Sequence, residues 1–259
     1  MTDYTREDIE TQLAEEIRPS FINANLSGLD LSGFDFSGID LSGTRFNETN
    51  LENANFTDAN LENAELKNAR LSGINFTSAN LTGIDFSKAR LEGIQFANAD
   101  LGKANLSEAH LGEANLTNTR LMAANLIRAN LERADLRGAQ LGEADFTGAN
   151  LNNANLSRAD LTRAKLSGAK LIEADLGRSN FKNADLGKAD FTDSKLNVCY
   201  YYEANLREAI LVRSEMKGTN LSGADLTDAK LTRADMTGAD LTDAKVRNAD
   251  MRRVKLSGA

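Results

Sequence analysis

Few side chains in this 259-residue chain could carry out chemistry, and their spacing does not favour catalysis. The single histidine, His110, has no cysteine or second histidine at a metal-ligand spacing. The single cysteine, Cys199, would need an adjacent base to act as a nucleophile, and no histidine lies near it in sequence. The glycines form no phosphate-binding or dinucleotide-binding motif. We therefore predict no catalytic residues, no cofactor and no metal site, and we expect that the protein is not an enzyme.

The element that must position these side chains is a five-residue repeat. Every fifth residue from Leu26 to Leu256 is apolar, which gives 47 such centres. The residue two before each centre, the minus-two position, is usually Ala, and the residue just before it is usually Asn or Asp. A period of five fits neither an α-helix nor a simple strand, so it indicates short extended segments joined by corners. The centre and the minus-two residue then point inward, and all 19 glycines fall at the two corner positions after a centre.

The phenylalanines indicate how many segments make one coil. Five pairs of phenylalanine centres are separated by two pentads and three pairs by four, and no pair is separated by one or by three. This parity favours an even number of sides, and four sides of one pentad each give a 20-residue coil. A coil of this size predicts that four phenylalanines stack as one ladder, namely Phe36, Phe56, Phe76 and Phe96.

Several units carry a family resemblance. Ala-Asp-Leu-Thr-Asp at 224–228 and 239–243, and Ala-Asn-Leu-Glu-Arg at 129–133, resemble the A(D/N)Lxx repeat of the pentapeptide-repeat family, and the match covers residues 24–259. The uninterrupted pattern is similar to members that are abundant in cyanobacteria. The resemblance implies an all-β solenoid, a right-handed quadrilateral parallel β-helix of about twelve 20-residue coils. It also implies that the Asn or Asp before each centre hydrogen-bonds to neighbouring backbone.

Both ends of such a solenoid need cover, because a terminal coil leaves backbone and apolar groups bare. Residues 5–8, Thr-Arg-Glu-Asp, resemble a capping box, and Ile9, Leu13 and Ile17 follow at four-residue spacing. This pattern predicts an amphipathic helix over about residues 6–17 that caps the first coil, although a partner-binding helix is the alternative. We expect residues 1–20 to form the cap and lead-in and residues 21–259 to form one repeat domain. The repeat runs to Ala259 without a comparable cap, so we expect a monomer or a weak homodimer through the C-terminal end.

Departures from the repeat predict where a partner binds. Residues 197–202 contain three of the four tyrosines, and the buried centre among them, Tyr201, needs a partner for its hydroxyl or a route to water. The candidate contact surface combines two groups of residues. The first is apolar, at outward positions within one coil of each other: Val198, Tyr200, Tyr202, Ile210 and Val212. The second is a set of arginines that recur at the coil spacing: Arg213, Arg233 and Arg253. Exposed aromatic patches are typical of protein contacts, and an arginine ladder can bind an acidic partner. A local bulge of the coil and a solvated charged face are the two alternatives.

Composition limits the class of partner and the compartment. The formal net charge of −8 argues against direct binding of nucleic acid. No apolar run approaches the ~18 residues of a membrane span, and the acidic first twenty residues do not resemble a secretory signal. One cysteine suits a reducing compartment. We therefore expect a cytoplasmic protein that binds an unidentified protein partner and no membrane.

Two functions remain open on this basis. The first is a non-enzymatic rigid scaffold or adaptor that mediates protein–protein interaction, with a role in regulation. The alternative, which the family resemblance implies, is a DNA mimic that binds DNA gyrase or another topoisomerase, as quinolone-resistance members do. The arginine ladder counts against a DNA mimic, because a positively charged DNA-binding surface would repel it.

Overall fold

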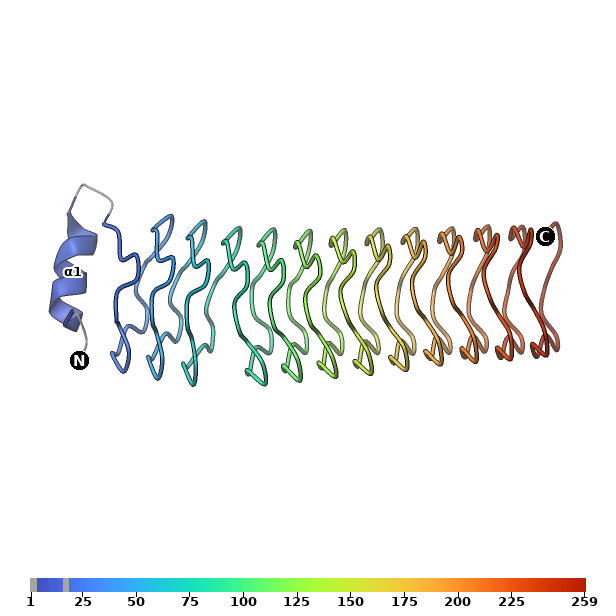
Figure 1. The fold of residues 1–259 in the computed structure, drawn as a ribbon, viewed down its shortest axis with the longest axis horizontal. Coiled ribbons are helices and arrows are strands. Elements are labelled where there is room, and N and C mark those ends of the chain that lie inside the picture. The colour runs from blue at the N-terminus through green and yellow to red at the C-terminus, as the bar shows by residue number, and fades with distance from the viewer. Residues whose placement is uncertain (1–3, 16–18) are drawn as a thin grey trace.

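The computed structural model describes residues 4–15 and 19–259, which form one helix, α1 (Arg6–Ala14), followed by a long stack of coils (Figure 1). The coils are held together by isolated parallel bridges between residues 20 apart, such as Asn105 with Asn125. These bridges sit at the position just before each centre, and no longer strand forms within the described residues. The spacing of the bridges agrees with four pentads in each 20-residue coil. The right-handed winding and the number of about twelve coils remain predictions.

The centres and the minus-two residues form the core of the rod. In the middle of the stack Leu136 and Ala134 are buried, with exposed fractions of 0% and 1%. The predicted phenylalanine ladder is confirmed, because Phe36 lies 5.0 Å from the ring centroid of Phe56, and Phe76 lies 5.5 Å from that of Phe96. The two middle rings, Phe56 and Phe76, are 5.4 Å apart. Alternation of side chains along each short extended segment therefore places both inward positions as predicted.

The second residue after each centre turns the corner in the left-handed region of backbone conformation. Glycine occupies some of these positions, as the corner interpretation predicts, but most carry another residue, for example Lys103 at φ 58° and Arg133 at φ 58°. Most corner amides also donate to the next coil, as the backbone N–H of Arg133 does to the carbonyl oxygen of Asn152 at 3.0 Å. The inter-coil hydrogen bonds thus offset the cost of a positive φ at residues that have a Cβ atom.

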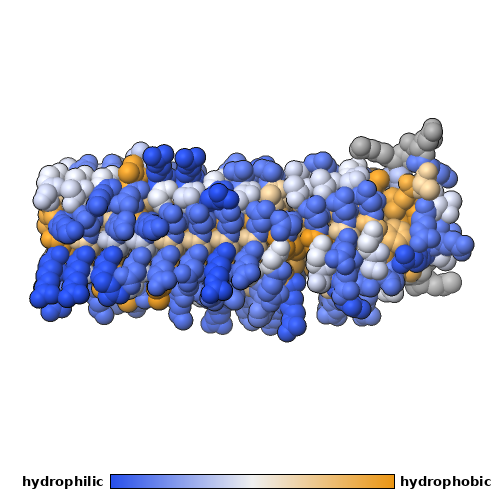
Figure 2. Space-filling model, turned by 180° about the vertical axis from the view of Figure 1, so that it is seen from behind, coloured by the Kyte–Doolittle hydropathy of each residue, from blue (hydrophilic) through white to orange (hydrophobic). Residues whose placement is uncertain are grey.

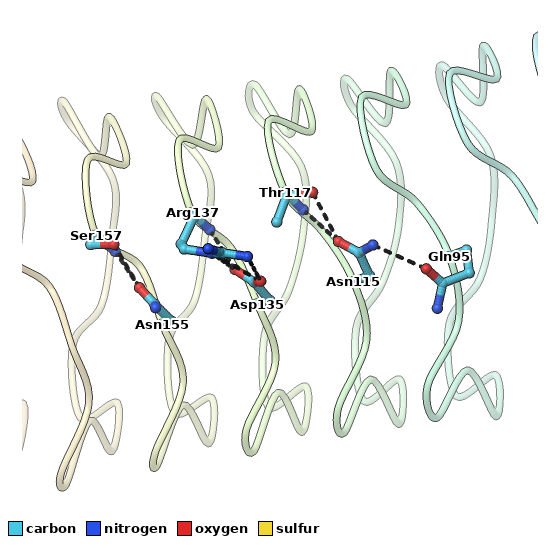
Figure 3. A network of polar contacts seen from close by, with 7 residues as sticks. All are labelled: Gln95, Asn115, Thr117, Asp135, Arg137, Asn155 and Ser157. Carbon is cyan, nitrogen blue, oxygen red and sulfur yellow. Dashed lines mark hydrogen bonds and ion pairs between the residues drawn. The ribbon is translucent and has the colours of Figure 1, made fainter.

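Side chains just before the centres form polar ladders along the outside (Figure 3). The side-chain oxygen of Asn115 accepts hydrogen bonds from the backbone N–H and the hydroxyl of Thr117 at 3.2 and 2.9 Å, and its amide donates to Gln95 of the previous coil at 3.0 Å. One coil further on, Arg137 donates to the carboxylate of Asp135 at 2.8 and 2.6 Å. These bonds fix the corner that follows each segment, in agreement with what the family resemblance implies.

Helix α1 lies across the N-terminal end of the stack (Figure 1). The predicted capping box is confirmed: the hydroxyl of Thr5 accepts from the backbone N–H of Asp8 at 3.1 Å, and the Asp8 carboxylate accepts from the N–H of Thr5 at 2.8 Å. The helix ends at Ala14, so the expected extent to residue 17 is wrong, and Ile17 lies outside the described residues.

The apolar stripe of α1 packs on the first coils. Ile9 is fully buried, and Leu13 is partly buried against the core. Arg6 donates to the backbone oxygen of Asp30 at 2.6 Å, and its guanidinium lies 4.7 Å from the ring centroid of Phe34. These contacts favour a capping role for the helix.

The ladder between coils is interrupted once, over residues 64–73 and 84–93. No bridge joins Glu65 to Asp85 or Arg70 to Arg90, and within the described residues the backbone N–H groups of Leu66 and Leu71 have no hydrogen-bond partner. A cleft of about 1360 Å³ lies between these segments, and Figure 1 shows the cyan and teal coils further apart there. We refer to this feature as the inter-coil cleft.

Like charges explain where the inter-coil cleft opens. Glu65 would stack directly on Asp85, and Arg70 on Arg90, at the distance of about 4.8 Å between neighbouring strands. The one other stacked pair of acids before a centre, Glu215 and Asp235, keeps its bridge. There Lys217 and Lys255 lie 3.6 and 3.3 Å from the Asp235 carboxylate and balance the charge. At the inter-coil cleft Glu65, Asp85 and Arg90 have no ion pair within the described residues, and only Arg70 is balanced, by Glu52 at 2.7 Å. The missing bridges thus coincide with like charges that are largely unbalanced.

The outer surface of the rod is mainly polar. Figure 2 shows a largely hydrophilic face, with hydrophobic surface near both ends and in a few places between them. At the C-terminal end the inward column becomes accessible, since Val246 and Leu256 are 42% and 41% exposed. No helix of the described residues is long and apolar enough to cross a membrane.

Candidate functional site

The two side chains with the most reactive chemistry lie in environments that do not activate them. His110 is exposed, and its Nδ1 is 3.8 Å from the carboxylate of Glu92. Cys199 is buried, and its thiol donates to the backbone oxygen of Leu176 at 2.9 Å. Burial raises the pKa of the Cys199 thiol to about 12, so the thiolate is scarce at neutral pH. Among residues 4–15 and 19–259 no group of three His, Cys, Asp or Glu side chains could hold a metal ion.

Three side chains within five consecutive residues stand out from the polar surface. Val198, Tyr200 and Tyr202 are 45%, 51% and 42% exposed. The coil beneath them is regular, because Tyr200 bridges both Asn180 and Asn220 in the usual 20-residue register. The tyrosines are therefore presented on an undistorted segment, which leaves no support for a local bulge.

Val198 adds a local backbone strain to this segment. It is the one β-branched residue among the described positions with a positive φ, at 61°. Side chains branched at Cβ crowd the backbone in this region, which makes such a conformation rare. The same corner position one and two coils earlier carries Arg178 and Arg158, which also have a positive φ. An exposed valine is thus kept where an unbranched polar residue would fit with less strain.

The two exposed tyrosines share a shallow depression with three basic side chains. The depression has a volume of about 680 Å³ and is lined by Tyr200, Tyr202, Arg158, Arg178 and Lys182, among other residues. The Nζ atom of Lys182 lies 5.3 Å from the ring centroid of Tyr202, within range of a cation–π interaction. We call these five residues the tyrosine–cation surface. The three basic residues were not among the contact residues predicted from the sequence, although their positions one or two full coils before Val198 and Tyr202 identify them as neighbours.

The expected single patch of apolar and arginine side chains is wrong, because the structure divides it between two sides of the rod. Ile210 and Val212 follow Tyr200 and Tyr202 by ten residues, which is half of a 20-residue coil and therefore the opposite side. They are also only partly exposed. The predicted arginine ladder belongs to that opposite side as well, since Arg213 follows Val212 directly.

Only part of that arginine ladder carries unpaired charge. Arg213 makes a two-pronged contact with the carboxylate of Asp193, and its Nε donates at 2.6 Å. This hydrogen-bonded guanidinium lowers the pKa of Asp193. Arg233 and Arg253 are exposed and have no ion pair within the described residues. A cationic side exists there, but it is separate from the tyrosines.

Tyr201 occupies an inward position, as predicted, but without the expected partner for its hydroxyl. The side chain is fully buried, and the hydroxyl has no hydrogen-bond partner among the described residues. Burial raises the pKa of Tyr201 well above its ordinary value. The residue therefore contributes to packing inside the rod and not to the exposed site.

Comparisons with known proteins agree on the type of repeat. Family models described as pentapeptide repeats of eight copies match residues 124–163, 159–197, 202–238 and 219–258, a model of nine copies matches 76–120, and a pentapeptide repeat region matches 18–96. A search of curated proteins found no match.

Solved structures of repeat proteins also match. HetL, a pentapeptide repeat protein involved in heterocyst differentiation regulation from the cyanobacterium Nostoc sp., is 30% identical, with 96% of this chain and 98% of that chain covered and a TM-score of 0.29. Full-length QnrB1, a plasmid-mediated fluoroquinolone resistance protein, is 22% identical, with 92% and 93% covered and a TM-score of 0.31. Rfr23, from the cyanobacterium Cyanothece 51142, is 24% identical, with 51% and 63% covered and a TM-score of 0.19.

Proposed function

The chain belongs to the pentapeptide repeat family, and we propose that it is a cytoplasmic, non-enzymatic scaffold or adaptor that binds a protein partner through Val198, Tyr200 and Tyr202. The observation that carries this proposal is the exposure of Tyr200 and Tyr202, 51% and 42%, on a regular coil of a polar rod. When a partner binds, a tyrosine side chain provides a large contact area and loses little conformational entropy. The regular backbone beneath it is already ordered, so binding need not fix its conformation.

The rest of the chain supports a binding role over a catalytic one. The Cys199 thiol is buried and has a raised pKa, and His110 faces solvent beside a carboxylate. Neither side chain has the hydrogen-bonded base or orienting group that nucleophilic catalysis needs. A rod that repeats one backbone unit along its length is suited to hold a contact surface in a fixed geometry.

The experiment that tests this proposal compares capture of partners by two variants. In the double variant Tyr200→Asn and Tyr202→Ser, residues that the repeat uses elsewhere replace both rings, so folding should be unchanged. The control is Met122→Thr, which removes another exposed apolar side chain four coils away. Quantitative mass spectrometry of proteins captured from the native cell should show a partner that the double variant loses by at least about tenfold and the control retains. If every captured protein binds the double variant as well as the natural protein, this surface is not the contact site.

A DNA mimic that binds DNA gyrase or another topoisomerase is the second candidate. The observation that favours it is the net charge of −10 over residues 1–100, from 17 acidic and 7 basic side chains. The net charge of +2 over residues 101–259 opposes it, because a DNA-binding surface would be repelled there. We therefore expect no effect of the protein on gyrase in a supercoiling assay at micromolar concentration. Inhibition or protection of the enzyme would favour the DNA mimic.

For the oligomeric state we propose a monomer or a weak homodimer that pairs through the C-terminal end. The exposed Val246 and Leu256 support contact between copies at that end. Sedimentation of the natural protein and of a Leu256→Ser variant over a range of concentrations would test this proposal. If the apparent mass rises with concentration equally in the natural protein and in the variant, the contact between copies lies elsewhere.

A further inference from the structure

We propose that the tyrosine–cation surface binds an acidic segment of polypeptide, with Arg158, Arg178 and Lys182 as the groups that recognise its carboxylates. This inference rests on the proposed function and adds the chemistry of the partner. It follows from the arrangement of these three cations, from their lack of acidic partners, and from the way one of them covers a tyrosine ring.

The winding of the rod gathers the five residues from three successive coils. Arg158 and Arg178 occupy the corner position that Val198 has in the coil of the tyrosines, and Lys182 occupies the position of Tyr202 one coil earlier. Bridges between residues 20 apart hold these coils in register, including Asp160 with Asn180 and Asn180 with Tyr200. The two guanidinium groups therefore lie along one edge of the depression and the ammonium group lies beside Tyr202.

These three cations have no ion pair within the described residues, and all three line one depression. Other bases, such as Lys230 and Arg233, are also unpaired, whereas Arg163 contacts Glu143 at 3.6 Å and Lys188 contacts Glu208 at 3.8 Å. Three unpaired positive charges within one depression of a protein with net charge −8 create a local field that is complementary to an acidic partner.

Two acids border the surface and do not cancel its charge. Asp160 lies in the depression, but its carboxylate accepts hydrogen bonds from the hydroxyl of Thr162 at 2.6 Å and from the amide of Asn180 at 3.2 Å. Glu203 follows Tyr202, and its interaction with the phenol raises the pKa of Tyr202. Three cations therefore face two acids that already have polar contacts, which leaves a net positive site.

The position of Lys182 favours a polypeptide over single-stranded nucleic acid. Nucleobases bind such surfaces by stacking on open aromatic faces, and the ammonium group of Lys182 lies over the ring of Tyr202. A carboxylate can instead contact the ammonium group while an apolar neighbour in the peptide packs on Tyr200 and Val198. The net charge of −8 also repels a long polyanion more strongly than a short acidic segment.

The test begins with a display library of random twelve-residue peptides, selected on the full-length protein. Binders are sorted by whether they also bind the double variant Tyr200→Asn and Tyr202→Ser. Dissociation constants of the peptides that need the tyrosines are then measured for a charge variant, Arg158→Gln, Arg178→Gln and Lys182→Gln. The matched control removes three unpaired cations from the opposite side of the rod, by Lys170→Gln, Lys230→Gln and Arg233→Gln.

We expect the tyrosine-dependent peptides to be enriched in Asp and Glu, and their dissociation constants to rise at least about tenfold in the charge variant and less than about twofold in the control. Peptides that need the tyrosines but lack acidic residues, and that bind the charge variant unchanged, would overturn this inference and leave the proposed function standing. If the library yields no peptide whose binding needs the tyrosines, both this inference and the proposed function would be overturned. A twelve-nucleotide single strand of DNA that displaces the peptides and binds more tightly would overturn the inference in favour of nucleic acid.

Discussion

The ring of Tyr201 stacks on that of Phe181 one coil earlier, with centroids 4.9 Å apart and planes inclined by 2°, while its hydroxyl has no hydrogen-bond partner in the described part of the chain. Tyr201 occupies a position that is Leu or Phe in most pentads. The stacking replaces the packing of those residues, but a buried hydroxyl without a partner costs about 1–3 kcal/mol. The coil therefore accommodates a polar atom that its own fold does not use.

We predict that Tyr201→Phe leaves the fold unchanged and increases the free energy of unfolding by about 1–2 kcal/mol, because the ring stacking is kept and the unpaired hydroxyl is removed. Chemical denaturation of both proteins would measure this. A loss of stability would show that the hydroxyl has a partner, such as an internal water molecule.

The inward columns should tolerate neither smaller nor larger residues. Leu136→Ala leaves a cavity and should lower the free energy of unfolding by about 2–5 kcal/mol. Ala134→Leu adds volume at a buried position and should lower it by about 1–3 kcal/mol. Both sites are 0–1% exposed. If denaturation shows Ala134→Leu to be neutral, the minus-two position is not a tight inward site.

The inter-coil cleft should close when its like charges are removed. Asp85→Asn and Arg90→Asn together keep the net charge and introduce the residue that the repeat commonly uses before a centre. We expect the free energy of unfolding to rise by about 1–2 kcal/mol, because the N–H groups of Leu66 and Leu71 regain partners in the next coil.

Hydrogen exchange measured residue by residue would test closure of the cleft directly. Exchange of the Leu66 and Leu71 amides should become slower in the double variant. The amide of Leu106, which already donates to Asn125 at 2.7 Å, is the internal control and should not change. Equal exchange of Leu66 and Leu71 in both proteins would show that charge does not hold the cleft open.

Acid should weaken the C-terminal coils through Asp235. Hydrogen bonds from the hydroxyl and N–H of Thr237, together with Lys255, lower the pKa of this carboxylate to about 2. Because this value lies below the unfolded pKa of about 3.9, the stabilisation is complete above about pH 4 and is lost as the pH falls through 2. Asp235→Asn should therefore reduce the dependence of the unfolding midpoint on pH between 4 and 2. An unchanged pH profile would assign the acid sensitivity to other carboxylates.

The sequence alone predicted the inward columns, the phenylalanine ladder and the capping box, since each depends on spacing along a regular chain. A repeat without insertions makes residues 20 apart neighbours, so the stacking of Phe36 on Phe56 could be inferred before any coordinates were known. The capping box of Thr5 and Asp8 depends on four consecutive residues. Where physical neighbours are set by a fixed period or by local sequence, the pattern of residue types is sufficient.

The coil spacing contains the neighbours of each outward residue, but only the tertiary structure showed which of them line one depression and contact each other. Tyr202 and Val212 are close in sequence, yet half a coil separates them, whereas Lys182 lies one full coil before Tyr202 and contacts its ring. The inter-coil cleft and the unpaired Tyr201 hydroxyl likewise depend on contacts between coils, where charge and side-chain conformation decide the outcome. Periodicity determines which side chains point inward, but winding the chain into 20-residue coils is what brings the tyrosines and their three cations together.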